Sequence, residues 1–319
     1  MQGKPGEHKL TMQAFAYIFN NAMETMHDER PLRGLNFVFS GGTAGIGLAA
    51  ATEVARRGAA VLLVGRDGER GARAVASVRA AGAGEAEFCA ADLTTIAGVA
   101  RAIEAIVAWR PRLHGLVHTA MTASLQRVDT ADGFERAFGL QYLARYALNR
   151  GLLAALAASG DGRIVHVGAK APAGLLPDLD DLQFRRRRWS LLPALMSSQV
   201  LGYLHVQEAA QRWRGLPVTT SIVCVGMTRT DTVRGWPWYI RGLYRLFGTA
   251  PERSAGNVIR LLTARDVGRA DGAILFDPRR FAPTPLALDA GLARRTWALS
   301  EQLTRERGLV LAGPDGGER

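Results

Sequence analysis

The chain has 319 residues, of which 48% are apolar and 22% are charged, and its 40 basic and 29 acidic side chains give a net charge of +11. These values are typical of a folded globular protein with a sizeable core. No apolar run approaches the roughly 18 residues of a membrane-spanning helix, so we expect no integral membrane segment. No nucleic-acid-binding motif accompanies the positive charge, so nucleic acid is not an expected partner.

The two cysteines, Cys89 and Cys224, lie in apolar segments that are expected to form strands. We therefore expect neither a disulfide nor a metal site. No secretion signal is visible at the N-terminus. Together these features favour a cytoplasmic protein, with peripheral contact at a membrane left open.

Residues 1–33 are expected to form an N-terminal extension. The apolar residues of LTMQAFAYIFNNAMETM recur at helical spacing, and this stretch ends at DERPLRG. Such a helix could pack on the main domain, touch a membrane surface or meet a partner. At the other end, residues 308–319, which finish with AGPDGGER, are expected to be a disordered tail.

Between residues 34 and 307 we expect a single domain in which short apolar runs alternate with amphipathic helical stretches. The predicted strands are LNFVFS, AAVLLVG, EAEFCAA, HGLVHT, RIVHVG, VTTSIVC and GAILF. Apolar strands separated by helices indicate a parallel sheet with helices on both faces. The predicted fold class is therefore α/β, with one doubly wound, Rossmann-type sheet.

A glycine-rich loop follows the first predicted strand, in LNFVFSGGTAGIGLAAATEVARRG, and an alanine-rich helix begins at once. Glycines let the backbone turn tightly and approach a diphosphate, whose charge then meets the N-terminal end of the helix. The strand and the helix are both in place, which makes this pattern more specific than isolated glycines. The predicted dinucleotide site comprises Ser40, Gly41, Thr43, Gly45, Ile46 and Gly47.

This loop resembles the TGxxxGIG loop of the short-chain dehydrogenase/reductase family, with Ser40 in place of the threonine. TADGFERAFGLQYLARYALNRGLLAAL is similar to the family's long central helix region. DDLQ and LARRTWALSEQL are similar to segments of its retinol-dehydrogenase-like branch. The resemblance covers about residues 35–305 and implies a nicotinamide cofactor, oxidoreductase ancestry and, by the family's habit, homodimers paired through long helices.

The end of the second predicted strand indicates which nicotinamide cofactor is bound. Gly65 stands where a member that prefers NAD usually carries an acidic residue, and Arg66 follows. Arginine suits a 2′-phosphate, which favours NADP(H). Asp92 and Leu93, after the third predicted strand, match the family's adenine-contacting pair.

The four positions of the family's catalytic residues are all altered. Counting forward from DLQ and backward from QEAAQRW both place Leu195 at the tyrosine and Gln199 at the lysine. Ala169 stands at the serine and Gln141 at the asparagine. Gln199 can still hydrogen-bond a ribose, but Leu195 has no proton to give. Loss of a general acid typically costs about 10²–10⁴ in rate, so ordinary carbonyl reduction should be very slow.

Other residues could supply the missing chemistry or reshape the site. His118 replaces an asparagine in HTAM, and an imidazole titrates near neutrality, so His118 is either an alternative proton donor or a structural residue. Met121 replaces a glycine near the expected cofactor path. Tyr203 lies about 12 Å along the helix from position 195, too far to act directly, and Lys170 should point away from the site of Ala169.

The binding cleft should be framed by residues 118–124, 168–200 and 226–248, because ligands bind at the carboxyl ends of the strands in doubly wound sheets. The last of these segments carries aromatic residues among arginines, which fits a large apolar ligand, a membrane surface or a simply packed helix. Three readings of function follow. The protein is a repurposed enzyme for cyclisation, isomerisation, dehydration or an unusual reduction, a non-catalytic binder of nucleotide or an apolar ligand, or a dehydrogenase whose acid comes from His118 or the substrate.

Overall fold

The computed structural model describes residues 30–82, 85–172, 175–276 and 288–311. The helix predicted before Arg30 and the AGPDGGER tail lie outside these residues, so the boundaries of the extension and the tail stay predictions. Arg30 itself is anchored to the domain, since its main-chain N–H donates to Thr263 O at 2.7 Å and its side chain pairs with Asp161 at 2.6 Å.

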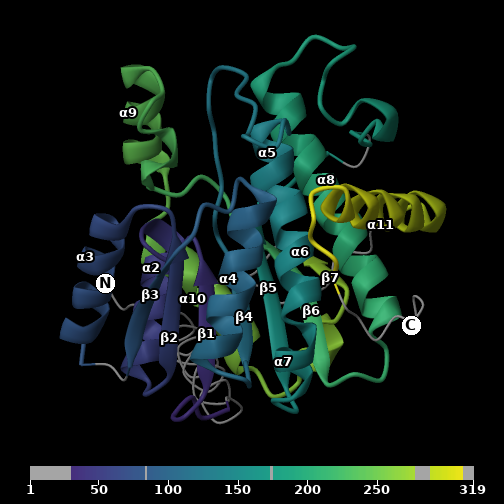
Figure 1. Cartoon of the computed structure of the whole chain (residues 1–319). Coiled ribbons are helices and arrows are strands. Elements are labelled where there is room, and N and C mark those ends of the chain that lie inside the picture. Colours follow the sequence, from purple (N-terminus) through teal and green to yellow (C-terminus); the bar gives the residue numbers. More distant parts are fainter. Residues whose placement is uncertain (1–29, 83–84, 173–174, 277–287, 312–319) are drawn as a thin grey trace, which may run out of the picture.

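Seven parallel strands form one sheet in the order β3-β2-β1-β4-β5-β6-β7 (Figure 1). Every run predicted as a strand is a strand, and the observed ends lie within one residue of the predicted ones. The predicted doubly wound α/β fold is therefore confirmed. The strands are β1 (Asn36–Ser40), β2 (Ala60–Gly65), β3 (Ala86–Ala90), β4 (Gly115–His118), β5 (Gly162–Gly168), β6 (Val218–Cys224) and β7 (Ala273–Leu275).

Helices connect the strands and cover both faces of the sheet (Figure 1). The longer helices are α2 (Gly45–Arg56), α3 (Gly68–Ala80), α4 (Ile96–Trp109), α6 (Ala144–Gly151), α8 (Leu191–Arg212), α9 (Trp238–Phe247), α10 (Pro251–Thr263) and α11 (Ala290–Arg305). The short ones are α5 (Arg136–Phe138), α7 (Leu153–Ala157), a π-helical turn η1 (Gly139–Leu143), and the 3₁₀ turns η2 (Leu179–Asp181), η3 (Asp231–Val233) and η4 (Val267–Ala270).

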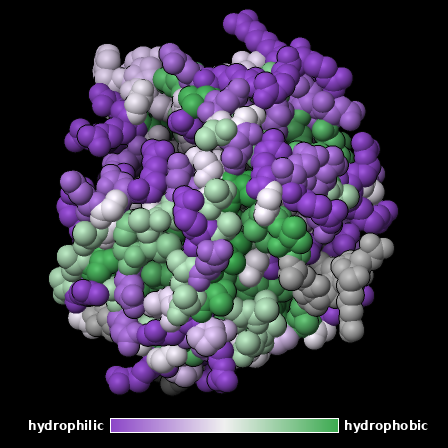
Figure 2. All heavy atoms as spheres, viewed as in Figure 1, coloured by the Kyte–Doolittle hydropathy of each residue, from purple (hydrophilic) through white to green (hydrophobic). Residues whose placement is uncertain are grey.

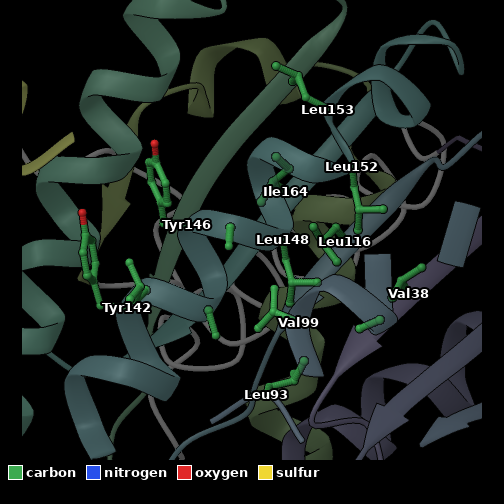
Figure 3. Close-up of a cluster of buried hydrophobic side chains, with 14 of the residues drawn as sticks. Val38, Leu93, Val99, Leu116, Tyr142, Tyr146, Leu148, Leu152, Leu153 and Ile164 are labelled. Atoms are coloured by element: carbon green, nitrogen blue, oxygen red, sulfur yellow. The ribbon is translucent and has the colours of Figure 1, made fainter. Parts of the chain in front are cut away.

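Alternation along the strands divides the core into two layers. Phe37 and Phe39 of β1 pack against α2 and α10, whereas Val38 between them packs on the opposite face with residues of α4 and α6. Figure 3 shows the second layer, in which side chains from β1, β4 and β5 meet Leu148 of α6. Successive residues of a strand point to opposite faces, so wholly apolar strands require this two-sided cover.

Helix α11 covers η1 and α6 on the outer side of this second layer. The Tyr142 hydroxyl lies 2.7 Å from Ser300 Oγ, and the Tyr146 ring packs edge-on against Trp297 with 5.2 Å between ring centroids. Tyr142 of η1 and Tyr146 of α6 are therefore buried between the core and α11.

Hydrophobic residues gather near the middle of the face shown in Figure 2, and hydrophilic residues dominate its upper margin.

None of the helices in the described ranges is both long and apolar enough to cross a membrane. Within the same ranges, no group of three or more histidine, cysteine, aspartate or glutamate side chains is arranged to hold a metal ion.

Candidate functional site

The glycine loop between β1 and α2 has the geometry of a diphosphate cradle. Gly41 has a φ of +85°, and a Cβ atom there would collide with the main chain of Ala120. A Cβ atom at Gly47 would collide with Thr119 Oγ1, and one at Gly45 would lie 2.9 Å from Thr230 Cγ2. The loop is therefore as close to its neighbours as glycine allows.

The N-terminal end of α2 points its first-turn N–H groups at this loop without a side-chain cap. Ala44 caps the helix without any side-chain hydrogen bond, so the first-turn donors have no side-chain partner at the cap. Together with the helix dipole, such donors suit an anionic diphosphate. Thr43 lies beside Gly65, where a Cβ atom would be 3.2 Å from Thr43 Cγ2. These residues therefore fit a dinucleotide.

The residues predicted to contact the adenosine half lie at the ends of the next two strands. Arg66 is exposed immediately after β2. Asp92 follows β3, and its Oδ1 atom accepts hydrogen bonds from the main-chain N–H and the hydroxyl of Thr94, at 3.0 and 2.8 Å. The Leu93 side chain is buried in the core, so only its main chain can face a nucleotide.

Hydrogen bonds connect the four positions at which the sequence resemblance places the family's catalytic residues. Gln141 lies in the π-helical turn η1, and its Nε2 donates to Ser198 Oγ at 2.9 Å. The Ser198 hydroxyl donates in turn to Leu195 O at 2.8 Å. Gln199, one residue further along α8, accepts a hydrogen bond from Ala169 N at 3.0 Å. All four positions thus meet where β5 ends against α8, and none carries an acidic or basic group.

Tyr203 supports the end of β5 and is not free for proton transfer. Its hydroxyl donates to Ala169 O at 2.6 Å and accepts from Ala171 N at 3.0 Å. Burial raises the pKa of this phenol well above its usual value. Lys170, between the two residues that Tyr203 holds, is exposed and lies over the Phe276 ring at 5.4 Å.

His118 is fully buried within a polar network below the site. Its Nδ1 lies 3.2 Å from Ser40 Oγ and its Nε2 lies 2.7 Å from Asn149 Oδ1, so both ring nitrogens have partners. The Asn149 amide nitrogen also lies 3.0 Å from His166 Nε2 and 2.8 Å from His205 Nε2. One asparagine thereby joins three imidazoles from β4, β5 and α8, and the Ser40 hydroxyl faces this network.

The network holds its histidines in the neutral form. Burial, together with the nearby Arg145 cation, lowers the pKa of His118 to about 3. Burial also lowers the pKa of His205 to about 3, and it lowers that of His166 well below its usual value. At neutral pH, none of these imidazoles therefore holds the second proton that a histidine general acid donates.

Arg145 adds a buried cation beneath the site, which the sequence did not point to. Its Nη1 donates to Val167 O at 3.1 Å and its Nη2 donates to Ala120 O at 2.9 Å, so the guanidinium joins the carboxyl ends of β5 and β4. Burial lowers its pKa to about 10, and it stays charged at neutral pH. Arg145 follows Gln141 by four residues, which places both on one side of the helix. This spacing is the one sequence feature that connects Arg145 to the site.

A small cavity lies beside Leu195 and contains one carboxyl group. Glu135 lines it together with Thr122 and Trp189. One Glu135 oxygen accepts from Phe138 N at 2.9 Å and the other from Trp189 Nε1 at 3.2 Å. Burial raises the pKa of this carboxyl. Sequence reasoning missed Glu135, because it is distant in the sequence from the altered positions.

The three segments predicted to frame the cleft come together at the carboxyl ends of the strands. Trp236 Nε1 donates to Ala123 O at 2.6 Å, which joins the segment after β6 to the segment after β4. Arg127 Nη1 donates to Phe184 O at 2.7 Å, which joins the segment after β4 to the segment after β5. Met121 is exposed on this rim.

The fold and the glycine cradle define a dinucleotide-binding protein of the doubly wound class. The family model described as short chain dehydrogenase matches residues 36–175. Polyprenol dehydrogenase of Mus musculus is 33% identical over 300 residues, which cover 90% of this chain and 87% of that protein. Retinol dehydrogenase 12 of Homo sapiens is 31% identical over 278 residues, covering 85% and 87%. The chain belongs to the short-chain dehydrogenase/reductase family, in its retinol-dehydrogenase-like branch.

Solved structures share this fold. An uncharacterised protein from Mycobacterium paratuberculosis has a TM-score of 0.66 at 25% identity, with 90% of this chain and 98% of that chain covered. L-sorbose reductase from Gluconobacter frateurii, complexed with NADPH and L-sorbose, has a TM-score of 0.62 at 20% identity, with 76% and 94% covered. The second likeness supports the fold alone. The family binds NAD or NADP, and the cradle described above fits such a cofactor.

Proposed function

We propose that this protein binds NADP(H) in the glycine cradle and a large, mainly apolar molecule in the adjoining cleft, and that it works there as an atypical small-molecule enzyme. The observation that carries the proposal is the hydrogen-bonded neighbourhood of Gln141, Ala169, Leu195 and Gln199, because none of these four side chains can protonate a substrate oxygen. The cradle remains beside a centre that lacks the family's proton donor.

The cofactor would be held by the glycine loop, by the N-terminal end of α2 and by Asp92. Arg66 supports the choice of NADP(H), because an exposed guanidinium beside Gly65 can pair with a 2′-phosphate. When bound, NADP(H) supplies hydride-transfer chemistry. Gln199 has its carbonyl oxygen committed to Ala169 N, which leaves its amide N–H groups for a ribose hydroxyl.

The reaction must proceed without an acid from position 195. Cyclisation, isomerisation, dehydration and the reduction of an activated substrate meet this requirement. Two observations support an apolar substrate. Large apolar side chains, including Met121, Leu125 and Met227, are exposed around the cleft, and similar proteins are named for polyprenol and retinol.

A non-catalytic binder is the second candidate function. It is favoured by the commitment of Gln199 and Tyr203 to the main chain of residues 169–171, which makes both side chains structural supports. A working dehydrogenase is the third reading, with a proton from His118 or from the substrate itself. Its difficulty is that His118 is buried with both ring nitrogens bonded. The one carboxyl that lines the small cavity beside Leu195 belongs to Glu135 and not to the network of His118.

Cofactor binding is tested by titrating NADPH and NADH into the purified chain while the nicotinamide fluorescence is followed. We expect micromolar affinity for NADPH and weaker binding of NADH. Arg66→Ala should weaken NADPH binding roughly 10- to 100-fold, because a hydrogen bond to a charged group contributes about 1.5–3 kcal/mol. The same substitution should leave NADH binding nearly unchanged.

The matched control is Arg73→Ala, which removes an exposed arginine from α3 and should leave both affinities unchanged. If the parent protein binds neither nucleotide, the cradle is not used and the enzymatic proposal is wrong. If Arg66→Ala weakens NADPH and NADH equally, the 2′-phosphate contact is wrong while nucleotide binding stands.

A further inference from the structure

A strongly amphipathic helix projects beyond the body of the protein. Helix α9 stands clear of the sheet in Figure 1, and none of its residues is buried. Trp238 is 78% exposed, Leu246 is 76% exposed and Phe247 is 67% exposed. A helix of a globular protein normally buries its apolar face, so an apolar face left exposed among the described residues marks a candidate docking surface.

The apolar and basic residues of α9 lie on opposite sides. At 100° per residue, the helix brings Tyr239, Leu243, Leu246 and Phe247 to one side. Arg241 and Arg245 fall on the other side. Between Asp231 and Glu252 the chain has no acidic residue. The same stretch adds a third arginine, Arg234, before the helix. An apolar face flanked by unopposed arginines is the pattern of a helix that lies in the interface of an anionic bilayer.

The protein holds α9 at a fixed place on its surface. Helix α9 lies in the segment 227–249, and the two ends of this segment are hydrogen-bonded to each other. Thr249 N donates to Met227 O at 2.8 Å, and Arg229 N donates to Thr249 O at 2.9 Å. Trp236, just before the helix, is tied to Ala123 O at 2.6 Å. The segment that carries the exposed apolar face is therefore held to the domain at both of its ends.

Other exposed apolar residues lie at the same end of the sheet. Among the described residues, the large apolar side chains that are exposed follow β4, β5 or β6, with the exceptions of Val107 and Val310. The loop before α8 adds exposed arginines 185–188, which the Asp181 carboxylate fixes by accepting from Arg185 N at 2.7 Å and Arg187 N at 3.0 Å. Figure 1 shows this loop and α9 extending beyond the same end of the sheet.

We propose that α9 docks the protein on an anionic lipid bilayer, with its apolar face in the headgroup boundary and its arginines at the phosphates. This surface is separate from the cofactor cradle and does not depend on the function proposed above. Docking through α9 would place the cleft rim, which also lies at the carboxyl ends of the strands, next to the membrane.

The test is flotation of the full chain with phosphatidylcholine vesicles that do or do not contain phosphatidylserine. We expect binding to the vesicles that contain phosphatidylserine, with an affinity that falls as salt rises. Arg241→Gln with Arg245→Gln should lower the partition coefficient roughly 30-fold, since each arginine near an anionic surface contributes about fivefold. Leu246→Ser with Phe247→Ser should abolish most of the binding.

Matched controls separate the surface from general charge or hydrophobicity. Arg112→Gln with Arg214→Gln removes two exposed arginines that precede β4 and β6, at the amino ends of the strands. Val107→Ser with Val310→Ser removes two exposed apolar residues that do not follow β4, β5 or β6. Both control pairs should float like the parent. Every substituted side chain in the four variants is exposed or partly exposed, so all should stay folded.

Depth of insertion gives a second readout. Lipids with brominated acyl chains should quench part of the tryptophan fluorescence of the parent, and Leu246→Ser with Phe247→Ser should remove that quenching. The proposal is overturned if the parent does not float with phosphatidylserine vesicles, or if the α9 variants float as well as the parent. It is also overturned if the parent forms dimers that Leu246→Ser with Phe247→Ser dissociates, because a second copy would then cover the helix.

Discussion

Gln199, which the sequence resemblance places at the family's lysine, is tied to the main chain around it. Its carbonyl oxygen accepts from Ala169 N and occupies the space beside Gly168, where a Cβ atom would lie 2.6 Å away. The side chain therefore fixes the end of β5 through its carbonyl oxygen, and this contact does not use its amide N–H groups. Leu195, one turn earlier, lines a small cavity and supplies no polar group there.

Restoring the two family side chains tests whether the site has kept its inherited geometry. We expect Leu195→Tyr with Gln199→Lys to raise NADPH-dependent reduction of apolar aldehydes by about 10²–10⁴ over the parent, which is the usual contribution of a general acid. The measurement is NADPH consumption across a panel of carbonyl compounds. Leu195→Phe with Gln199→Lys is the control that lacks the phenol hydroxyl, and equal activity in the two variants would contradict the prediction.

At the scale of elements, the glycine loop depends on its contact with the chain after β4. Gly41 and Gly82 both have a positive φ, of +85° and +80°, but a Cβ atom would collide with Ala120 only at Gly41. An alanine at positive φ costs about 1–2 kcal/mol at either place. The collision should add about 1–3 kcal/mol, since the main chain must move to relieve it.

We therefore expect Gly41→Ala to lower the free energy of unfolding more than Gly82→Ala does, and to abolish NADPH binding that Gly82→Ala leaves intact. Urea unfolding and nicotinamide fluorescence measure the two effects. Similar losses of stability in both variants would mean that the loop can relax, and that the close approach to Ala120 is unimportant.

The strands and the glycine loop could be predicted because their signals are local. Apolar runs such as AAVLLVG can be satisfied only by burial on both faces, and Gly41, Gly45 and Gly47 identify a turn that no other residue fits. The π-helical turn at Gln141 has no such signal, since one extra residue per turn leaves the apolar pattern of the helix nearly unchanged. Sequence left the role of α9 open, because a packed amphipathic helix and an unpartnered one have the same periodicity.

The network of buried histidines matters for the stability of the whole molecule. Sequence could not predict it, because Asn149, His166 and His205 are distant in the chain and meet only in the folded sheet. In the folded protein the three imidazoles stay neutral, whereas in the unfolded chain each takes up a proton below about pH 6.5. The unfolded state therefore binds more protons between that pH and about 3, and folding is weakened as the pH falls.

We expect the free energy of unfolding to fall by about 4 kcal/mol between pH 7.5 and pH 5.5, since each histidine contributes about 1.4 kcal/mol per pH unit once the unfolded form is protonated. Urea unfolding at a series of pH values measures this slope. His205→Phe should be less stable than the parent at pH 7.5 and should lose about one third of the slope. A stability that is flat over this range would show that the buried imidazoles do not control it.

Helix α11 sets a limit on how two copies of the chain can meet. The family resemblance predicts pairing through the long helices, but Trp297 and Ser300 lie over Tyr146 and Tyr142 on the outer side of those helices. Pairing through that face would require α11 to move, so any dimer must use another surface or rearrange this one. The residues described for the glycine cradle, for the neighbourhood of Leu195 and for the buried imidazoles all belong to one polypeptide.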